Sequence, residues 1–257
     1  IMPSLVGSEM CIRDSYIFVY GNCDMEERLE YFDREYLGSY EEIKVDSEIP
    51  HQKPFDRTGR VEGVYSVTED EGTDNKTYLA YNASIGEAGD MKLSLAFTVL
   101  EYALFNAPGA PVRQALIDAG IGEDVSGSYD NSIRQPMVTI MAANTNPDKE
   151  EEFVKVIKES LEKLIKEGIN KDTLRAGINY NEFRYRVADF GRWPKGLMYG
   201  IDMLSSWLYD DNKPFLNMQL GEAYAFLKEQ VESDYFEQLI KKYLLDNAHS
   251  SVVVLKP

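Results

Sequence analysis

Cysteine and histidine are scarce in this sequence. Its 257 residues include two cysteines, Cys11 and Cys23, and two histidines, His51 and His249. A disulfide framework or a thiolate metal site needs more cysteines at closer spacing, so a reducing compartment is the simplest interpretation. The two histidines lie far apart in the chain, and we interpret both as ordinary surface or packing residues. These residues predict no metal site in this chain.

Glycine, proline and long apolar runs are also limited. The 18 glycines and 10 prolines are too few for a collagen-like or low-complexity chain. The longest apolar stretch, around residues 93–105, is interrupted by Thr98 and Glu101 and is shorter than the ~20 residues that a bilayer crossing requires. With 44% hydrophobic residues, we expect a water-soluble globular protein of one large or two small domains.

Positive charge is in deficit. Lysine and arginine number 27 against 44 aspartates and glutamates, which gives a net charge of −17. Such a chain repels phosphate backbones and anionic lipid headgroups. We therefore expect neither nucleic acid nor a membrane surface among its partners.

The first 15 residues show no helical or strand periodicity. They also lack the basic start and the small-residue cleavage pattern of a signal peptide. They resemble adapter sequence translated in frame at the start of shotgun-derived genes. We expect residues 1–15 to be non-native or disordered, and the gene to be truncated at its 5′ side.

Strand and helix patterns alternate along the rest of the chain. Residues 16–20 form a β-rich run, and Asp24 is a suitable N-cap for a helix to about residue 37. Residues 38–75 are acidic, contain Pro50 and Pro54, and have little apolar periodicity. This composition is typical of a solvated connector between two bodies.

Residues 76–257 read as one compact body. We expect strands at 77–85, 125–129, 137–142 and 251–255, and helices at 90–106, 111–119, 147–168, 170–190, 197–208, 222–231 and 234–245. Strands at both ends with helices between them favour an α+β fold, a two-layer arrangement of one sheet with helices packed on one face.

The residues alone indicate no active site. Dinucleotide-binding, phosphate-loop and nucleophile-elbow motifs are missing. Carboxylate pairs such as Glu150/Glu151 and Asp210/Asp211 are too common in so acidic a chain to be assigned as acid and base. Ser126 and Ser128 have no base that spacing could assign to them.

Several longer motifs carry a family resemblance. They are APGAPV (107–112), ALIDAGIGEDVSGSY (115–129), ADFGRWPKGL (188–197) and SWLYD (206–210), together with Tyr81-Asn82 and residues 93–104. In this order and spacing, the chain from residue 16 to residue 257 resembles the presequence-protease and falcilysin-like branch of the pitrilysin (insulinase) zinc metallopeptidases.

The resemblance implies an architecture in which this chain is one part. Members of that family are clamshells of four homologous αβ domains that enclose a chamber and digest unstructured peptides. Zinc is held in the first domain by a His-x-x-Glu-His helix and a downstream glutamate. The resemblance implies that residues 16–37 are the last part of the catalytic domain and that residues 38–75 connect it to the next one. Residues 76–257 then form the second, non-catalytic domain. This chain then carries no catalytic or metal residue, and zinc is expected only in the full-length protein.

A degenerate counterpart of the zinc helix is expected within residues 90–106. Glu101 occupies the place of the motif glutamate, while Thr98 and Tyr102 stand where both imidazoles would be. A lone glutamate cannot hold zinc. The ordinary alternative is one polar residue on a packed helix.

The expected function is that of a chamber wall and peptide-binding domain, inactive by itself. Its partners would be the remaining domains of the same polypeptide and peptide substrates. The alternative is a metal-free scaffold or interaction subunit of the same fold. An in-frame His-x-x-Glu-His upstream of Tyr16 would favour the peptidase, and a start codon near Met2 the scaffold. We expect a cytoplasmic protein if the source is bacterial and a mitochondrial or plastid one if it is eukaryotic.

Three residues are candidates for contact with peptide. Tyr129 and Arg134 lie on the predicted strand and hairpin segment, and Trp193 precedes Pro194 in a loop. Aromatic residues beside chain breakers also commonly anchor loops, so a structural role competes with substrate binding at each position.

Overall fold

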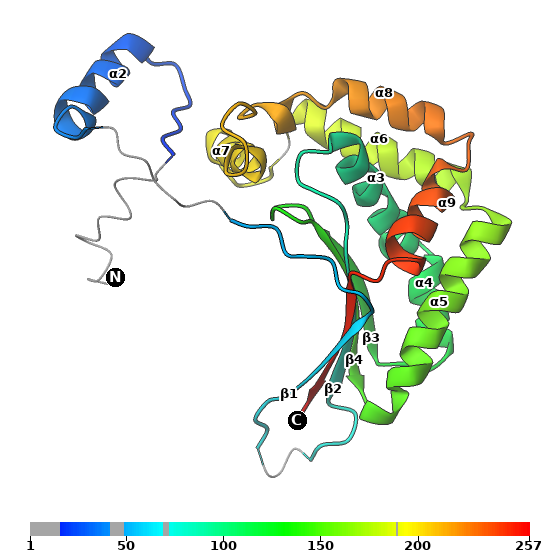
Figure 1. The fold of residues 1–257 in the computed structure, drawn as a ribbon. Coiled ribbons are helices and arrows are strands. Elements are labelled where there is room, and N and C mark those ends of the chain that lie inside the picture. The colour runs from blue at the N-terminus through cyan, green and yellow to red at the C-terminus, as the bar shows by residue number, and fades with distance from the viewer. Residues whose placement is uncertain (1–15, 42–48, 69–71, 189) are drawn as a thin grey trace.

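A five-stranded mixed sheet with helices on one face forms the body of the protein (Figure 1). The computed structural model describes residues 16–41, 49–68, 72–188 and 190–257. The strands, in the spatial order β1-β5-β2-β4-β3, are β1 (Gly59–Val64), β2 (Thr77–Ser84), β3 (Asp124–Asp130), β4 (Met137–Thr145) and β5 (Ser250–Lys256). β1 runs parallel to β5, and the other neighbouring strands are antiparallel.

The α-helices of the described residues are α2 (Met25–Phe32), α3 (Met91–Glu101), α4 (Pro111–Asp118), α5 (Glu150–Glu167), α6 (Lys171–Val187), α7 (Lys195–Trp207), α8 (Gly221–Gln230) and α9 (Tyr235–Ile240). Side-chain N-caps begin α2, α3 and α6. The side chain of Asp90 accepts a hydrogen bond from the Leu93 amide, and Asn170 accepts one from Thr173, each at 3.0 Å. These N-caps satisfy amide groups that the first turn leaves without an intrahelical acceptor.

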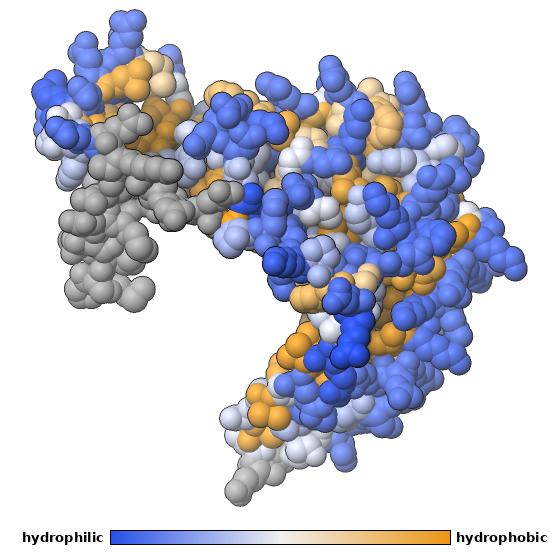
Figure 2. All heavy atoms as spheres, viewed as in Figure 1, coloured by the Kyte–Doolittle hydropathy of each residue, from blue (hydrophilic) through white to orange (hydrophobic). Residues whose placement is uncertain are grey.

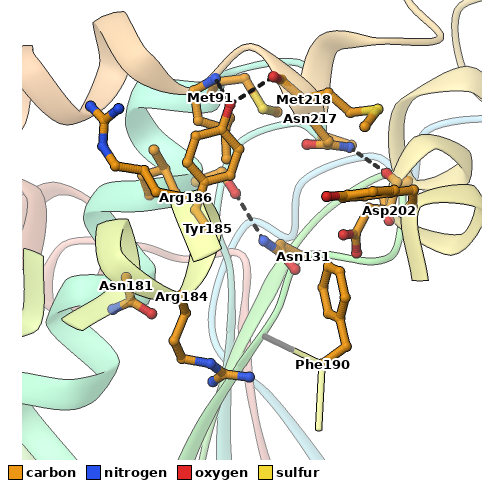
Figure 3. Close-up of a pocket in the computed structure, with 16 residues that line it drawn as sticks. Met91, Asn131, Asn181, Arg184, Tyr185, Arg186, Phe190, Asp202, Asn217 and Met218 are labelled. Atoms are coloured by element: carbon orange, nitrogen blue, oxygen red, sulfur yellow. Dashed lines mark hydrogen bonds between the residues drawn. The ribbon is translucent and has the colours of Figure 1, made fainter. Parts of the chain in front are cut away.

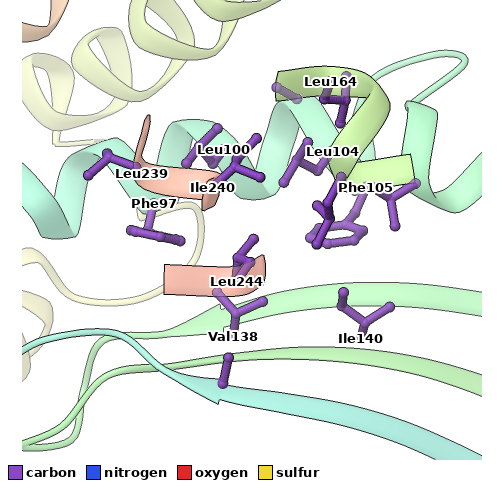
Figure 4. Close-up of a cluster of buried hydrophobic side chains, with 14 of the residues drawn as sticks. Phe97, Leu100, Leu104, Phe105, Val138, Ile140, Leu164, Leu239, Ile240 and Leu244 are labelled. Carbon is purple, nitrogen blue, oxygen red and sulfur yellow. The ribbon is translucent and has the colours of Figure 1, made fainter. Parts of the chain in front are cut away.

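The predicted α+β fold with helices on one face of the sheet is confirmed. Buried residues alternate along β2, where Leu79, Tyr81 and Ala83 face the helices. Figure 4 shows Phe97, Leu100 and Leu104 from the α3 side of this core above Val138 and Ile140 of β4. In Figure 2, hydrophilic side chains dominate the visible surface over the helical layer, as the large negative charge leads one to expect.

The expectation of a strand at residues 16–20 is wrong. These residues lie outside any strand, and their aromatic rings contact α7. The rings of Tyr16 and Trp207 are 4.7 Å apart between centroids. A Cβ atom on Gly200 would lie 2.8 Å from the Phe18 ring, so the glycine permits this close approach. An extended segment with alternating aromatic residues can pack against a helix as well as pair in a sheet, and the sequence pattern does not distinguish these two arrangements.

The prediction of a solvated connector over residues 38–75 is wrong for β1. Gly59–Val64 lies in that range and is the edge strand of the sheet, with Val61 opposite Val253 of β5. The strand is polar because it lies at an edge, where charged side chains remain in water and discourage pairing with another chain. Arg60 Nε donates to Glu150 Oε1 of α5 at 2.7 Å. The other domain boundaries stay predictions, and the expectation for residues 1–15 lies outside the described residues.

Glu182 on α6 is a carboxylate held between two cations. Its side chain is 11% exposed and lies 2.7 Å from Arg186 Nη2 and 2.5 Å from Lys228 Nζ on α8. Hydrogen bonds from Lys228 and Arg186 lower the pKa of Glu182. The contact with Lys228 connects α6 to α8 across the helical layer.

We expect Glu182→Gln to lower the free energy of unfolding by about 1 kcal/mol at about pH 7, because it removes the charge that pairs with Arg186 and Lys228. Because the folded-state pKa of Glu182 lies below that of the unfolded chain, the carboxylate stabilises the fold above about pH 4.3. This contribution is lost as the pH falls through the lowered folded-state value. Urea unfolding of both proteins over the acidic range measures the difference.

The matched control for this pH series is Glu229→Gln. Glu229 is an exposed carboxylate on α8, next in sequence to Lys228. Its replacement changes the net charge equally and should produce no comparable pH-dependent difference. If the deficit of Glu182→Gln stayed constant down to the most acidic sample, the ion-pair explanation would be wrong.

Candidate functional site

A cavity of about 580 Å³ lies between α6, α7, the segment before α8 and the start of α3 (Figure 3). Apolar and aromatic side chains share its lining with polar ones; they include Met91, Leu95, Phe190, Tyr199, Met218, Asn131, Asn181, Arg184, Asp202 and Asn217. Its volume falls within the range of about 300–1,000 Å³ that is usual for ligand pockets. The cavity is therefore the candidate site on this domain.

Aromatic packing builds one wall of the cavity. Ala188 is the C-cap that follows α6, and its left-handed φ of 50° turns the chain before α7 begins. This turn brings the ring of Phe190 to 5.5 Å from that of Tyr199 on α7. Tyr20 lies 5.6 Å from the same Tyr199 ring. The segment that precedes α2 thus supports the cavity wall through Tyr199.

Three asparagine side chains line the cavity, and each has its amide nitrogen bound by the protein. Asn131 Nδ2 donates to Ser94 Oγ at 3.1 Å, Asn181 to the Gly177 carbonyl at 2.9 Å, and Asn217 to the Asp202 carbonyl at 2.8 Å. Within the described part of the chain, no donor reaches their Oδ1 atoms. The amides therefore offer mainly hydrogen-bond acceptors to a ligand.

The charged groups of the cavity have unequal partners. Arg186 is paired with Glu182, and the Arg184 guanidinium lies 5.7 Å from the centre of the Tyr180 ring. The Asp202 carboxylate has neither an ion pair nor a hydrogen bond to the residues that the structure describes. Burial raises the pKa of Asp202. In Figure 3, Arg184 and Asp202 lie on opposite sides of the cavity, with Asn131 between them.

The three sequence-predicted contact residues lie at separate points, and none of them lines this cavity. The Tyr129 ring packs 5.6 Å from that of Phe97 in the core, and burial raises the pKa of its hydroxyl. Arg134 donates to His51 Nε2 at 3.0 Å and to the Ile49 carbonyl, so it connects residues 49–51 to the β3–β4 loop. Trp193 is 55% exposed.

Sequence reasoning missed Asp202, Asn131 and Asn217. One signal was available, because Asp202 is a lone carboxylate within the otherwise apolar run of α7. The asparagines carried no such signal, since nothing in their local sequence distinguishes them from loop residues.

The counterpart of the zinc helix does not fit zinc. Thr98 Oγ1 donates to the Ser94 carbonyl at 3.1 Å, and Glu101 accepts from Asn106 Nδ2 at 3.3 Å. The Tyr102 ring stacks on that of Tyr180 at 6.5 Å. Burial raises the pKa of Glu101, and its helix supplies no imidazole. Over the described ranges, no group of three or more histidine, cysteine, aspartate or glutamate side chains could hold a metal ion.

Comparison with known proteins identifies the family. The sequence model of the Peptidase M16 inactive domain matches residues 13–180. The chain belongs to the M16 peptidase family. The predicted membership in the pitrilysin-type metallopeptidases is thereby confirmed, and the matched domain is the inactive one of that family.

Two curated relatives are similar to nearly the whole of this M16 chain. The chain is 42% identical to Protein HypA of Clostridium perfringens over 95% of its own length and 25% of that protein. It is 28% identical to Presequence protease 1, chloroplastic/mitochondrial, of Arabidopsis thaliana over 94% of its length and 23% of that protein. It spans about a quarter of each of these curated relatives.

Solved structures share the fold of this M16 chain. A protease from Helicobacter pylori superimposes with a TM-score of 0.65 at 15% identity, over 92% of this chain and 53% of that one. At this identity the likeness extends to the fold alone. None of the helices among the described residues has the length and apolar character needed to span a bilayer.

Proposed function

We propose that this chain is the non-catalytic portion of a zinc metallopeptidase that degrades unstructured peptides. In this proposal residues 76–257, with β1 added to their sheet, form a wall of the peptide chamber, and residues 16–37 belong to the end of the catalytic domain. The match of residues 13–180 to the M16 inactive domain carries the non-catalytic part of the proposal. Because that match also includes residues 16–37, the assignment of this segment to the catalytic domain rests on the family resemblance alone. Relatives about four times as long leave room for catalytic domains elsewhere in the polypeptide.

In this proposal, zinc is bound by a different domain of the longer protein. The helix with Thr98, Glu101 and Tyr102 lacks the ligands for it, so the metal and the water it activates would be supplied by another domain of the longer protein. The partners of this chain are then those domains and the peptide itself. A cytoplasmic location follows for a bacterial parent, and an organellar one for a eukaryotic parent such as the Arabidopsis relative.

Trp193 is the predicted contact residue that we retain as a proposed peptide contact. More than half of its surface is exposed, and the Arg192 guanidinium lies 5.7 Å from the centre of its ring. Tyr129 and Arg134 have packing and loop contacts that already account for them, and their role in peptide binding stays a prediction.

A cleavage and binding assay on the purified chain tests the proposal. We expect no hydrolysis of an unstructured fluorogenic peptide, with or without added zinc, and no stoichiometric zinc after dialysis. We expect the same peptide, carrying a fluorophore, to bind in an anisotropy titration. A zinc protease that cleaves the peptide serves as the positive control. Cleavage that resists a chelator, or tightly held zinc with turnover, would overturn the proposal.

A further inference from the structure

The Asp202 side of the cavity is built to accept hydrogen bonds. Asp202 contributes a carboxylate without a partner among the described residues, and Asn131 and Asn217 contribute amide oxygens because their nitrogens already donate to Ser94 and to the Asp202 backbone. A ligand that matches these groups must be rich in donors. A guanidinium or an ammonium group has this property and no acceptor of its own.

Aromatic rings adjoin the same acceptors. Phe190 and Tyr199 both line the cavity, with their rings 5.5 Å apart in an edge-to-face arrangement. A cation held near aromatic faces is attracted by their quadrupoles as well as by a carboxylate. In Figure 3, Phe190 and Asn131 lie near the Asp202 carboxylate. An apolar side-chain stem would contact the rings while its charged end reached Asp202.

No cationic side chain among the described residues already pairs with Asp202. Arg186 is paired with Glu182, which Lys228 also neutralises. Arg184 is directed to the Tyr180 ring and lies across the cavity from Asp202. Asp202 therefore lacks a countercharge within the described ranges, and an incoming cation would relieve the cost of its partial burial.

We propose that this cavity binds the basic side chain of an arginine or lysine within an extended peptide, with Asp202 as the countercharge. Arg184, on the opposite side, is placed to donate to a carbonyl of the same peptide. The cavity volume of about 580 Å³ accommodates a long side chain and adjoining backbone. This inference rests on the proposed function, because it specifies which peptides the domain selects.

Two capped peptides that differ in one group test the inference. The first is acetyl-Ala-Ala-Arg-Ala-Ala-amide, and the second carries citrulline, a neutral near-isostere, in place of arginine. Calorimetric titration into the full 257-residue chain should show the arginine peptide binding about tenfold more tightly, since hydrogen bonds to charged groups contribute more than neutral ones. Asp202→Asn should abolish this preference and leave citrulline binding unchanged.

Two further variants keep the test decisive. Glu229→Gln removes one negative charge from exposed α8, outside the cavity, and should leave both affinities unchanged. Asn131→Asp adds a second carboxylate, to which the Ser94 hydroxyl, now an acceptor from Asn131 Nδ2, can rotate and donate, so the arginine peptide should bind several-fold more tightly. Because Asp202→Asn removes a desolvated charge, its thermal midpoint should equal or exceed that of the wild type. If the Asp202→Asn variant fails to fold, the tighter binding expected for Asn131→Asp tests the inference instead.

The outcomes separate this inference from the proposed function. If both peptides bind equally and Asp202→Asn has no effect, the basic-side-chain pocket is overturned while peptide binding by the domain stands. If neither peptide binds, the pocket is overturned and the proposed peptide contact of the chamber wall fails with it. A preference for arginine that depends on Asp202 supports both.

Discussion

Phe105→Ala should lower the free energy of unfolding by about 3–5 kcal/mol, because it removes a large aromatic side chain from the core. Phe105 follows α3, is 2% exposed, and lies directly over Gly127 of β3. A Cβ atom at position 127 would lie 2.2 Å from Phe105 Cγ. Gly127→Ala should therefore also destabilise strongly, by about 3 kcal/mol, since the ring cannot move away without disturbing its neighbours.

The double variant Phe105→Ala/Gly127→Ala gives the sharper result. The new methyl group at 127 enters the volume that the ring vacates, so the second substitution should be nearly neutral. Denaturant unfolding of the four proteins measures the coupling energy, which should reach about 3 kcal/mol in magnitude, the loss expected for Gly127→Ala alone. Gly89→Ala is the control, because a Cβ atom there would contact nothing within 4 Å. Strictly additive losses would show that the ring does not rest on Gly127.

Val254→Asp should abolish cooperative folding, whereas Val253→Asp should leave a folded protein. Val254 is fully buried under the helices, opposite Leu79 of β2, in a strand that lies between β1 and β2. Burying an unpaired carboxylate there costs several kcal/mol, comparable with the ~5–15 kcal/mol that stabilises a typical domain. Val253 points to the uncovered face, where a charge can reach water.

Circular dichroism and thermal unfolding of the two neighbouring variants provide the measurement. Val253→Asp should keep the native spectrum and lose about 1–2 kcal/mol, mainly through lower β propensity and lost packing. Equal damage from both substitutions would contradict the register in which Val254, and not Val253, faces the helical layer.

The helices could be predicted from the sequence because the patterns that specify them are local. Phe153, Ile157, Leu161 and Leu164 recur at helical spacing along α5, and all four are buried. Asn170 opens α6 as a side-chain cap. Such patterns act over a few residues, so tertiary contacts rarely override them when the apolar stripe is long.

The edge strand of the sheet and the cavity could not be predicted from local sequence patterns. β1 contains Arg60 and Glu62 and has no apolar alternation, so its place beside β5 depends on strand pairing with residues almost 200 positions away in the chain. Asn131, Phe190, Asp202 and Asn217 meet only because α6, α7 and the β3–β4 connection pack together. Local sequence carries no record of such long-range neighbours.

The sequence by itself placed the chain among the pitrilysin-type peptidases, through the resemblance that its motifs carry in their order and spacing. Its two histidines and two cysteines predicted no zinc site within it, because these ligand types are too few. Packing in three dimensions decided the rest. It placed Tyr129 in the core, occupied Arg134 with residues 49–51, and left the Asp202 carboxylate without a countercharge among the described residues. The physical reason is that burial and countercharge are properties of neighbours in space, which chain composition does not specify.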